Sequence, residues 1–559
     1  MTDTIPRLDS RPGGLNIYYK GKYLYHEQSP EEHTQIRASS IPLPEKSIII
    51  VPSPLLGYGI KQLLQRLPST SHLLCIEKDQ LLMEITLRMF LPQILQDSRI
   101  SLIRTDSIPA LIEFVGEKID WKQFRKVLLV SLNRGYLLYR SFYDEVQRQL
   151  LLHLERVHRN RLTTIRMGKR WMSNLFQNLL HLPKALHMEQ FRIRKPPLVV
   201  GAGESLEDRF EWIEKIRESV YLMAVDTALP VLGSLGIRPD LAMSVDSQAI
   251  NLQDFLSLPY EGIPLIADLT VYPGILRNWK GPLYLLLTRF ESLRWFEDPL
   301  VISMLPTMIP PLGSVGNIAL YIACTYSDPA LPILCLGMDF HYIPGKPHAR
   351  GSYTHRVHVF RHHRLDPSPL LEHSLNRQKG TARLLNGQSV RVDPVLQSFQ
   401  EVARTICQRE RRIYTLSTRG LDFGAIPIED FRQVTSLLGE IRPVAKTIPD
   451  EFPLPPPYGN TRKVLQFLQE EYGRLEELEA GIEKKMYPGS THLFLHKGIY
   501  CNLESLDFLF LDLPELPPHE TRGTSEGFST SLAVQLVSNI KYYLRILSQI
   551  QRGFNLPRT

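Results

Sequence analysis

A glycine-rich turn follows the short apolar run Pro197–Val200. The turn reads G-A-G-E-S, and the residues in it that could hold an anion are Gly201, Gly203 and Ser205. This pattern is typical of a buried parallel strand that turns into a helix, because glycine lets the backbone approach a phosphate and the helix N-terminus offers N–H groups. The turn alone is a weak signal, since many such turns need glycine only for packing.

Carboxylates follow the next two apolar runs. Leu222–Val225 leads into Asp226, and Leu241–Val245 leads into Asp246. The carboxyl ends of parallel strands form the ligand-binding edge of an open α/β sheet, so either aspartate could contact ribose hydroxyls or a base. Each could instead cap the helical segment that follows it.

Two further segments contain glycine and polar residues at the ends of apolar runs. G-S-V-G-N precedes an apolar helical pattern and offers Gly313, Ser314 and Asn317 as a second anion site. Gly337 and Asp339 follow another buried run. For Asp339 we expect an organising role, in which the carboxylate accepts N–H groups of neighbouring loops, rather than proton transfer.

Histidines are concentrated in one stretch of the chain. Histidine suits acid–base chemistry near neutral pH, so one or two of them could contact a ligand or act in catalysis. The pattern H-x-H-R-H-H could suggest zinc, but no cysteine or acid lies at the usual spacing, and we expect no metal site. Seven of the 17 histidines belong to this stretch: His341, His348, His355, His358, His362, His363 and His373.

The overall composition is that of a soluble globular protein. A net charge of +7 slightly favours anionic partners such as nucleotides or a membrane surface, and it does not by itself indicate nucleic acid. The five cysteines form no C-x-x-C pair, which favours a reducing compartment. No signal peptide and no apolar run of about 20 residues is visible, so we expect a cytoplasmic protein without a membrane span.

Alternating strand and helix patterns predict an α/β protein, and 559 residues are too many for one core. We expect an N-terminal α/β accessory domain over 1–190 that ends in basic helices. A central Rossmann-like domain over 191–440 would carry the site, and a helical domain over 460–559 would follow a proline-rich linker. Within the central domain, residues 340–390 lose periodicity, which is typical of a functional lid or a disordered segment, and we expect a lid.

Within the first of these domains we predict a hairpin over 15–25 and a strand–helix–strand unit that ends at Glu77. That acid lies where a ribose could be bound, but the loop S-P-L-L-G-Y-G is not the dinucleotide motif, so we expect no cofactor. Helices over 136–190 carry basic residues that could face a polyanion or an acceptor protein, or simply solvent. These basic residues are Arg156, Arg159, Arg161, Arg166, Lys169 and Arg170.

Taken in order, several motifs resemble the motility-associated factor family. They are L-Y-H-E-Q-S-P-E-E-H (24–33), W-M-S-N-L-F-Q-N-L (171–179), G-A-G-E-S-L (201–206), the stretch A-V-D to S-V-D (224–246), G-S-V-G-N-I-A (313–319) and L-G-M-D-F-H-Y-I-P-G-K-P-H-A-R-G (336–351). Members of that family are bacterial flagellin glycosyltransferases that transfer nonulosonic acids such as pseudaminic or legionaminic acid. The resemblance therefore implies this activity, with flagellin and a CMP-nonulosonic acid as partners.

The central motifs are also similar to those of bacterial sialyltransferases, which use CMP-sialic acid on a Rossmann-like domain without metal. The resemblance implies that the glycine turn, Asp226 and Asp246 hold the nucleotide and that Ser314 contacts the sugar carboxylate. His341 and His348 would face the donor phosphate. The base would be one of His355, His358, His362 and His363.

Glu204 departs from the family pattern, which has proline at this position of the turn. It brings a negative charge near the expected phosphate, and we expect its side chain to point outward.

The sequence thus predicts a metal-independent glycosyltransferase that modifies Ser/Thr hydroxyls of flagellin and has no cofactor besides its CMP-sugar donor. Two alternatives stay open. The central region also resembles archaeal 6-hydroxymethylpterin diphosphokinases, which would need Mg²⁺ held by carboxylates such as Asp226, Asp246 and Asp339. The chain could instead be a flagellin-binding assembly protein without catalysis.

Overall fold

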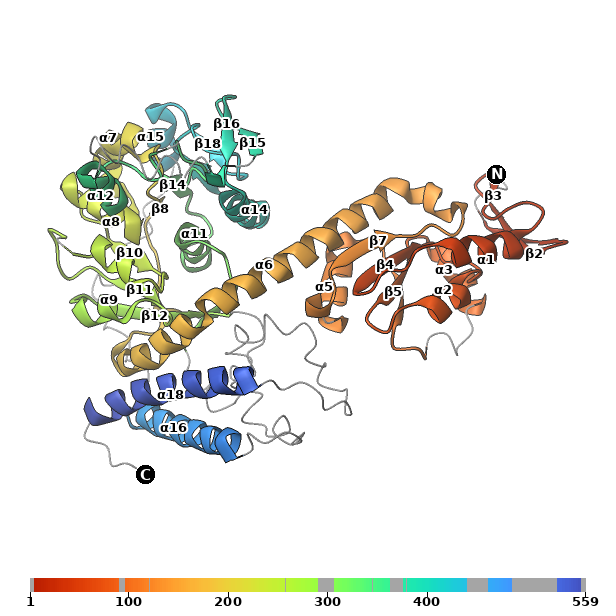
Figure 1. The fold of residues 1–559 in the computed structure, drawn as a ribbon. Coiled ribbons are helices and arrows are strands. Elements are labelled where there is room, and N and C mark those ends of the chain that lie inside the picture. Colours follow the sequence, from red (N-terminus) through yellow and green to blue (C-terminus); the bar gives the residue numbers. More distant parts are fainter. Residues whose placement is uncertain are drawn as a thin grey trace. The chain divides into compact units, whose positions relative to one another are not determined.

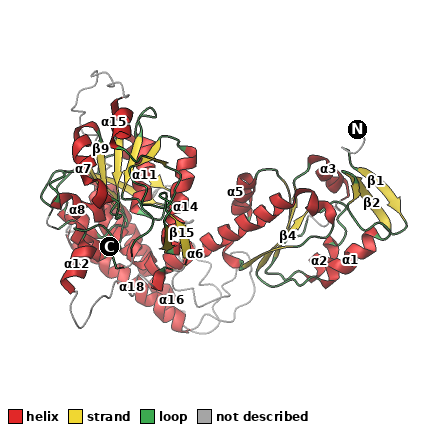
Figure 2. Cartoon of the chain, turned by 90° about the horizontal axis from the view of Figure 1, so that it is seen from above, coloured by secondary structure: helices red, strands yellow, loops and turns green. Residues whose placement is uncertain are grey.

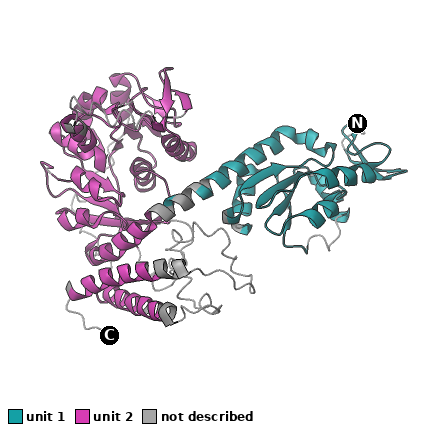
Figure 3. Ribbon diagram, in the orientation of Figure 1, with its two compact units in different colours: residues 1–163 teal, residues 164–559 magenta. Residues whose placement is uncertain are grey.

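The computed structural model describes residues 5–89, 96–119, 121–256, 258–289, 306–343, 345–361, 376–378, 380–439, 461–484 and 530–553 (Figure 1). The chain divides into two compact units, residues 1–163 and residues 164–559 (Figure 3). The sequence predicts three domains, with the first ending at residue 190. The first unit instead ends at residue 163, within one long helix that belongs to both units. No helix in the described ranges is long and apolar enough to cross a lipid bilayer.

Unit 1 contains a three-stranded antiparallel sheet and a four-stranded parallel sheet in the order β6-β5-β4-β7. The predicted hairpin is confirmed: Lys20 and Gly21 both have positive φ, as a tight turn between antiparallel strands requires. Its strands are β1 (Arg7–Arg11), β2 (Gly14–Tyr19), β3 (Lys22–Tyr23), β4 (Ser47–Pro52), β5 (His72–Glu77), β6 (Ile100–Arg104) and β7 (Lys126–Leu129). Its helices are α1 (Pro30–Ser40), α2 (Ile60–Arg66), α3 (Gln80–Met89) and α5 (Ile108–Lys118).

The helix α6 (Arg140–Asn178) begins in unit 1 and ends in unit 2. It runs for 39 residues without an internal proline, since Pro183 lies in the 3₁₀ segment η3 (Leu179–Lys184) that follows. The 3₁₀ segment η4 (Met188–Gln190) then leads toward the central sheet. The helical pattern predicted over 136–190 is confirmed for most of that range.

Unit 2 is built on a nine-stranded sheet in which every pair is parallel, in the order β13-β12-β11-β10-β9-β8-β14-β17-β18. The first strand, β8, therefore lies between β9 and β14, and the chain reverses its direction of progress across the sheet there. The strands are β8 (Pro197–Val200), β9 (Tyr221–Val225), β10 (Leu241–Ser244), β11 (Leu265–Asp268), β12 (Leu283–Thr288), β13 (Met308–Ile309), β14 (Ile333–Leu336), β17 (Ile413–Thr415) and β18 (Ile426–Pro427).

Helices cover both faces of this sheet (Figure 2). The central strands β8 and β14 are buried along their whole length, which explains why they are uninterrupted apolar runs. The helices are α7 (Leu206–Ile216), α8 (Leu229–Ser234), α9 (Pro273–Asn278), α11 (Val315–Tyr326), α14 (Pro394–Arg409) and α15 (Phe431–Gly439). The predicted Rossmann-like α/β architecture of the central region is confirmed.

The predicted lid, residues 340–390, is not structureless. It contains the helix α12 (Tyr353–Arg361) and most of a hairpin, β15 (Gly380–Arg383) and β16 (Ser389–Val392). His362, His363 and His373 lie outside the described residues.

The C-terminal helices α16 (Thr461–Lys484) and α18 (Thr530–Gly553) pack against each other and join the hydrophobic core of unit 2. The rings of Tyr543 and Phe176 of α6 pack edge-to-face with their centroids 6.0 Å apart. Lys169 Nζ lies over the ring of Tyr542, 4.4 Å from its centroid. The described part of 460–559 is therefore an addition to unit 2, because its buried apolar faces need that core.

Phe467 of α16 is fully buried in this shared core. We expect Phe467→Ala to lower the free energy of unfolding of unit 2 by about 3–5 kcal/mol, because it leaves a large cavity. Hydrogen exchange of peptides from β8 and β14 would report the loss. Leu235→Ala, a control at a partly exposed position, should cost less than about 1 kcal/mol. Unchanged exchange in β8 and β14 would mean that α16 and α18 fold independently of the sheet.

Candidate functional site

The glycine turns after β8 and β14 pack back to back at the point where strand order reverses. The Gly203 N–H donates to the Gly337 carbonyl at 2.9 Å, and the Gly201 N–H donates to the Leu336 carbonyl at 2.8 Å. A Cβ on Gly201 would lie 2.4 Å from the Gly337 carbonyl oxygen, and a Cβ on Gly337, whose φ is +72°, would lie 2.3 Å from the Gly201 carbonyl oxygen. These glycines are needed for the close approach of two backbones.

Ser205 and Asp339 complete this contact. The Ser205 N–H donates to Asp339 Oδ2 at 2.8 Å, the Ser205 hydroxyl donates to Asp339 Oδ1, and the Gly337 N–H donates to Ser205 Oγ at 3.2 Å. Burial raises the pKa of Asp339, opposed by the hydrogen bonds from Ser205. Asp339 thus has the organising geometry expected of it. The N–H groups of Gly201, Gly203 and Ser205 are occupied within the protein, so they do not form the phosphate cradle predicted for them.

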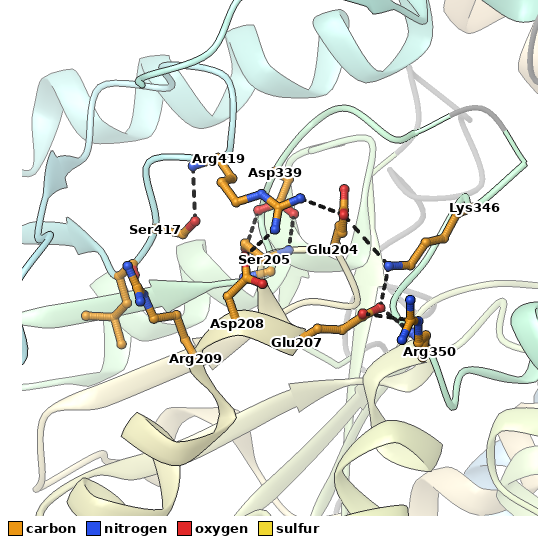
Figure 4. Close-up of polar contacts among 12 residues, drawn as sticks. Glu204, Ser205, Glu207, Asp208, Arg209, Asp339, Lys346, Arg350, Ser417 and Arg419 are labelled. Carbon is orange, nitrogen blue, oxygen red and sulfur yellow. Dashed lines mark hydrogen bonds and ion pairs between the residues drawn. The ribbon is translucent and has the colours of Figure 1, made fainter. Parts of the chain in front are cut away.

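Glu204 does not point outward (Figure 4). Its side chain is 12% exposed and lies 2.6 Å from Arg419 Nη2 and 3.7 Å from Lys346 Nζ. The expectation was wrong because two cations from separate loops reach over the turn and hold the carboxylate. The negative charge that the turn acquires in place of proline is therefore compensated.

The first turn of α7 extends this ion-pair network (Figure 4). Glu207 contacts Lys346 Nζ at 2.8 Å, accepts the Arg350 N–H at 2.7 Å, and lies 3.6 Å from Arg350 Nε. Asp208 pairs with Arg419. Acidic residues in this position are also favoured by the helix dipole. The network ties the segment after β14 and the loop after β17 to the N-terminus of α7.

The candidate histidines occupy three different environments. His341 is buried, and its Nε2 donates to the Arg419 carbonyl at 2.5 Å. Burial lowers the pKa of His348 to about 4, which keeps its ring neutral, and its buried Nδ1 has no hydrogen-bond partner among the described residues. His355 lies on α12, where its N–H donates to Ser352 Oγ at 3.3 Å. A neutral His348 can form a hydrogen bond with a phosphate but does not supply a proton near pH 7.

The G-S-V-G-N segment forms the start of α11. Ser314 is the N-cap and accepts the Asn317 N–H at 3.2 Å. The buried Asn317 side chain donates to the carbonyls of Leu312 and Phe399, both at 2.9 Å. A Cβ on Gly313 would lie 2.7 Å from the Phe399 ring. Gly313 and Asn317 therefore join α11 to α14, and the Ser314 hydroxyl keeps a proton to donate.

Asp226 and Asp246 lie at the ends of the neighbouring strands β9 and β10. Asp226 Oδ2 accepts from the Ser244 hydroxyl at 2.9 Å and Oδ1 accepts from the Thr227 N–H at 2.9 Å, while burial raises the pKa of Asp226 to about 6. Asp246 is half-buried, and its Oδ1 accepts the Gln248 N–H at 2.9 Å. Neither side chain caps the helical segment that follows it.

A third carboxylate, Asp254, faces these two and was missed from the sequence. It ends the 3₁₀ segment η7 (Ala249–Asp254), is 6% exposed, and makes no hydrogen bond with any described residue. Burial raises its pKa to about 7, aided by the charges of Asp226 and Asp246 and opposed by Arg356 of α12. The signal available in the sequence was an acid between the apolar residues Leu252 and Phe255.

Two asparagines of α6 hold the loops beside these carboxylates. Asn174 Nδ2 donates to the carbonyls of Ser247 and Thr270, both at 3.0 Å. One turn later, Asn178 Nδ2 donates to the carbonyls of Leu269 and Val271 at 2.9 and 2.7 Å. Both asparagines lie in the W-M-S-N-L-F-Q-N-L motif, whose sequence indicated the segment but not this role. The motif positions the loops that follow β10 and β11.

Glu77 of unit 1 is held by its own chain. Its Oε1 accepts the Asp79 N–H at 2.9 Å and lies 3.4 Å from both Ser53 Oγ and the Tyr143 hydroxyl. Burial raises the pKa of Glu77 to about 7. Tyr143 of α6 thus contacts the oxygen that was expected to face a ribose.

Within the described residues, no group of three or more His, Cys, Asp or Glu side chains could hold a metal ion. Asp339 in particular is occupied by Ser205, so it does not join Asp226 and Asp246 as a magnesium ligand.

A family model described as 6-hydroxymethylpterin diphosphokinase MptE-like matches residues 169–345. This part of the chain is similar to MptE-like domains. The match runs from the last turns of α6 through β14, so it includes the glycine turns, the three aspartates at the sheet edge and the asparagines of α6.

The whole chain is similar to a solved structure, that of the MAf glycosyltransferase from Magnetospirillum magneticum AMB-1. The TM-score is 0.55 at 13% identity, over 98% of this chain and 92% of that one. At this identity the likeness shows the fold. The fold that the resemblance to the motility-associated factor family implies is therefore confirmed.

Two proteins of Treponema pallidum (strain Nichols), both described as uncharacterized, are also similar in sequence. One is 28% identical over 424 residues, which is 74% of this chain and 73% of that protein. The other is 32% identical over 103 residues, 18% of this chain and 48% of that protein.

Gly337→Ala tests the contact between the glycine turns. Gly236 has nearly the same φ, +70° against +72°, but open space around its Cβ position, so Gly236→Ala serves as the matched control. The control should cost about 1 kcal/mol of backbone strain. Gly337→Ala should cost at least about 2 kcal/mol more in chemical denaturation, because its methyl meets backbone that cannot move aside. Equal losses would show that the turns are not in close contact.

Asp254→Asn tests the unpaired carboxyl by stability alone. The raised pKa means that the folded state holds the Asp254 proton more tightly than the unfolded state. Wild-type stability is therefore full below about pH 4 and falls as the pH rises through about 7. We expect Asp254→Asn to exceed the wild type by about 2–4 kcal/mol at pH 8 and to match it at pH 4.

Thermal and denaturant unfolding at both pH values would measure this difference. Glu261→Gln, an exposed acid paired with Lys280, is the control and should show no such dependence on pH. A stability difference that is the same at pH 4 and pH 8 would contradict the burial of an ionisable Asp254.

Proposed function

We propose that this chain is a glycosyltransferase that transfers a nonulosonic acid of pseudaminic or legionaminic type from its CMP-activated form to Ser/Thr hydroxyls of flagellin. The observation that carries the proposal is the extent of the shared fold. The likeness to the MAf glycosyltransferase covers 98% of this chain, so it includes unit 1 and the C-terminal helices as well as the central sheet. A small-substrate kinase has little use for either addition.

The polar groups at the sheet edge support a nucleotide-sugar donor. Asp246 is half-buried and can accept hydrogen bonds from ribose hydroxyls or the base, while Asp226 is anchored by Ser244. Ser314 keeps a hydroxyl proton for the sugar carboxylate. The donor phosphate would meet the cations Lys346 and Arg419, which the carboxylates of the turn hold in place. Because these cations neutralise Glu204, the turn repels the donor phosphate less than an unpaired carboxylate would.

The proposed reaction needs few catalytic parts. CMP is a good leaving group, so the protein must position the donor, stabilise the departing phosphate and accept a proton from the acceptor hydroxyl. His341 and the neutral His348 serve the phosphate as hydrogen-bonding groups. His355 on α12 stays a candidate for contact with the acceptor.

We place this reaction in the cytoplasm. Cys75, Cys324, Cys335 and Cys407 are free thiols, which supports a reducing compartment.

The MptE-like match favours one second candidate, a Mg²⁺-dependent diphosphokinase of the pterin type. That reaction needs carboxylates grouped around the ion. Asp226, Asp246 and Asp254 approach one another, but the described residues include no group that could hold a metal. Calorimetry with CMP and with ATP plus Mg²⁺ separates the two. Binding of CMP but not of ATP plus Mg²⁺ supports the transferase, and binding of ATP plus Mg²⁺ but not of CMP overturns it.

The direct test is intact-mass analysis of flagellin co-expressed with this protein and a pathway that makes CMP-nonulosonates. We expect a mass increase of one or more nonulosonic acid residues. Asp246→Ala should abolish the increase, and Asp246→Asn, which keeps an acceptor for the Gln248 N–H, should reduce it at least tenfold because the charge is lost. Glu261→Ala is the exposed control. Unmodified flagellin with wild-type protein and CMP-sugar present would contradict the proposal and favour a non-catalytic flagellin-binding protein.

A further inference from the structure

Among the described residues, Asp254 differs from Asp226 and Asp268 at this edge of the sheet because no described donor reaches its oxygens. Asp268, at the end of the adjacent strand β11, is more deeply buried but accepts the N–H and hydroxyl of both Thr270 and Thr288, at 2.7–2.8 Å. Asp226 is held by Ser244 and Thr227. A buried carboxylate without partners costs stability. Groups that keep such a cost are concentrated at functional sites.

The charges around Asp254 come from three elements. Asp226 follows β9, Asp246 follows β10, and Arg356 lies on α12. The helix α9, which also packs against η7, carries one charged residue, Arg277, whose Nε lies 3.4 Å from the Pro273 carbonyl of the same helix. The negative charges of Asp226 and Asp246 therefore raise the pKa of Asp254, and the positive charge of Arg356 lowers it.

We propose that Asp254 is the general base that accepts the proton of the acceptor hydroxyl, and that α12 brings Arg356 to it. This inference rests on the proposed function and assigns a step for which the sequence offered only lid histidines. Neither oxygen of Asp254 accepts a hydrogen bond from a described residue, whereas His355 stands next to Arg356 on the same helix and already contacts other groups. Asp254 lies beside Asp226 and Asp246, the residues to which the proposed function assigns the donor.

The step balances in atoms and electrons. The bond between the anomeric carbon and the phosphate oxygen breaks, and its electron pair leaves with CMP. The hydroxyl oxygen of the acceptor Ser or Thr forms the new bond to the anomeric carbon, and its proton passes to the Asp254 carboxylate. Asp254 then returns the proton to solvent. No oxidant, reductant or further reactant is required.

The surroundings suit a base near neutral pH. Burial and the two aspartates raise the pKa of Asp254 to about 7, so the group is partly ionised and partly able to hold a proton under these conditions. Activity of the wild type should therefore rise with pH through about 7 and level off above it.

The test measures transfer from CMP-pseudaminic or CMP-legionaminic acid to purified flagellin between pH 5.5 and 9, for the wild type, Asp254→Asn and Asp268→Asn. We expect Asp254→Asn to lower kcat at least 100-fold, to change the KM for the donor less than threefold, and to lose the rise near pH 7. Formate should restore part of the activity of Asp254→Ala. Asp268→Asn should unfold more easily yet keep the pH profile.

Each outcome decides the matter. A rise near pH 7 that persists in Asp254→Asn, or that disappears in His355→Ala instead, overturns the assignment of the base. A change confined to the KM for the donor also overturns it and makes Asp254 a binding residue. No transfer by the wild type at any pH overturns the proposed function together with this inference, so the two failures are distinguishable.

Discussion

The close contact between the backbones of Gly201 and Gly337 is the constraint on which the rest of unit 2 depends. It lets β14 lie beside β8 and places the reversal of strand order at the centre of the sheet, where open α/β sheets bind ligands. Asp339 closes the contact by accepting from Ser205. Because two backbones meet there without room for a Cβ, the candidate ligand-binding aspartates lie to one side of this contact, on the loops after β9 and β10. The glycine-rich turn therefore supports the candidate site from below and does not offer its own N–H groups to a ligand.

Two kinds of buried carboxyl surround that turn. Asp226, Asp268 and Asp339 accept several hydrogen bonds each, so their burial stabilises the loops that they join. Asp254 accepts no hydrogen bond from the described residues, so the burial of its ionised form lowers the stability of the fold. Glu204 shows a third solution, since Arg419 and Lys346 neutralise it. A buried carboxyl group is thus structural, reactive or neutralised by cations, depending on which hydrogen-bond donors and charges the fold places near it.

The strands and the parallel sheet could be predicted from the sequence, because continuous apolar runs such as Pro197–Val200 have few alternatives when both faces are covered. The positions of glycines and acids at strand ends were equally visible. The hydrogen bonds that the N–H groups of the glycine turn make with the turn after β14 could not be predicted. Gly203 and Gly337 are brought together only by the order of the strands in the sheet. For the same reason, Glu204 was expected to point outward, because its partner Arg419 is distant in sequence. Asp254 was overlooked because the charges near it, on Asp226 and Arg356, are also distant in sequence. The buried faces of α16 and α18 could not be assigned to unit 2 from helical periodicity alone, which says that a helix needs a partner but not which one.

The bond between Ser205 and Asp339 joins residues 134 positions apart. During synthesis, β8 leaves the ribosome on the order of ten seconds before β14 exists to pair with it. Throughout that interval the growing sheet has β8 as an open edge, with apolar side chains on both faces and unpaired N–H groups along one side. Strands β9 to β13 can add to its other edge in turn, so the sheet grows outward in one direction first. The centre of the finished sheet is therefore among the last parts of it to form, and a nascent chain interrupted before Gly337 would carry the aspartates of the site without the contact that orders them.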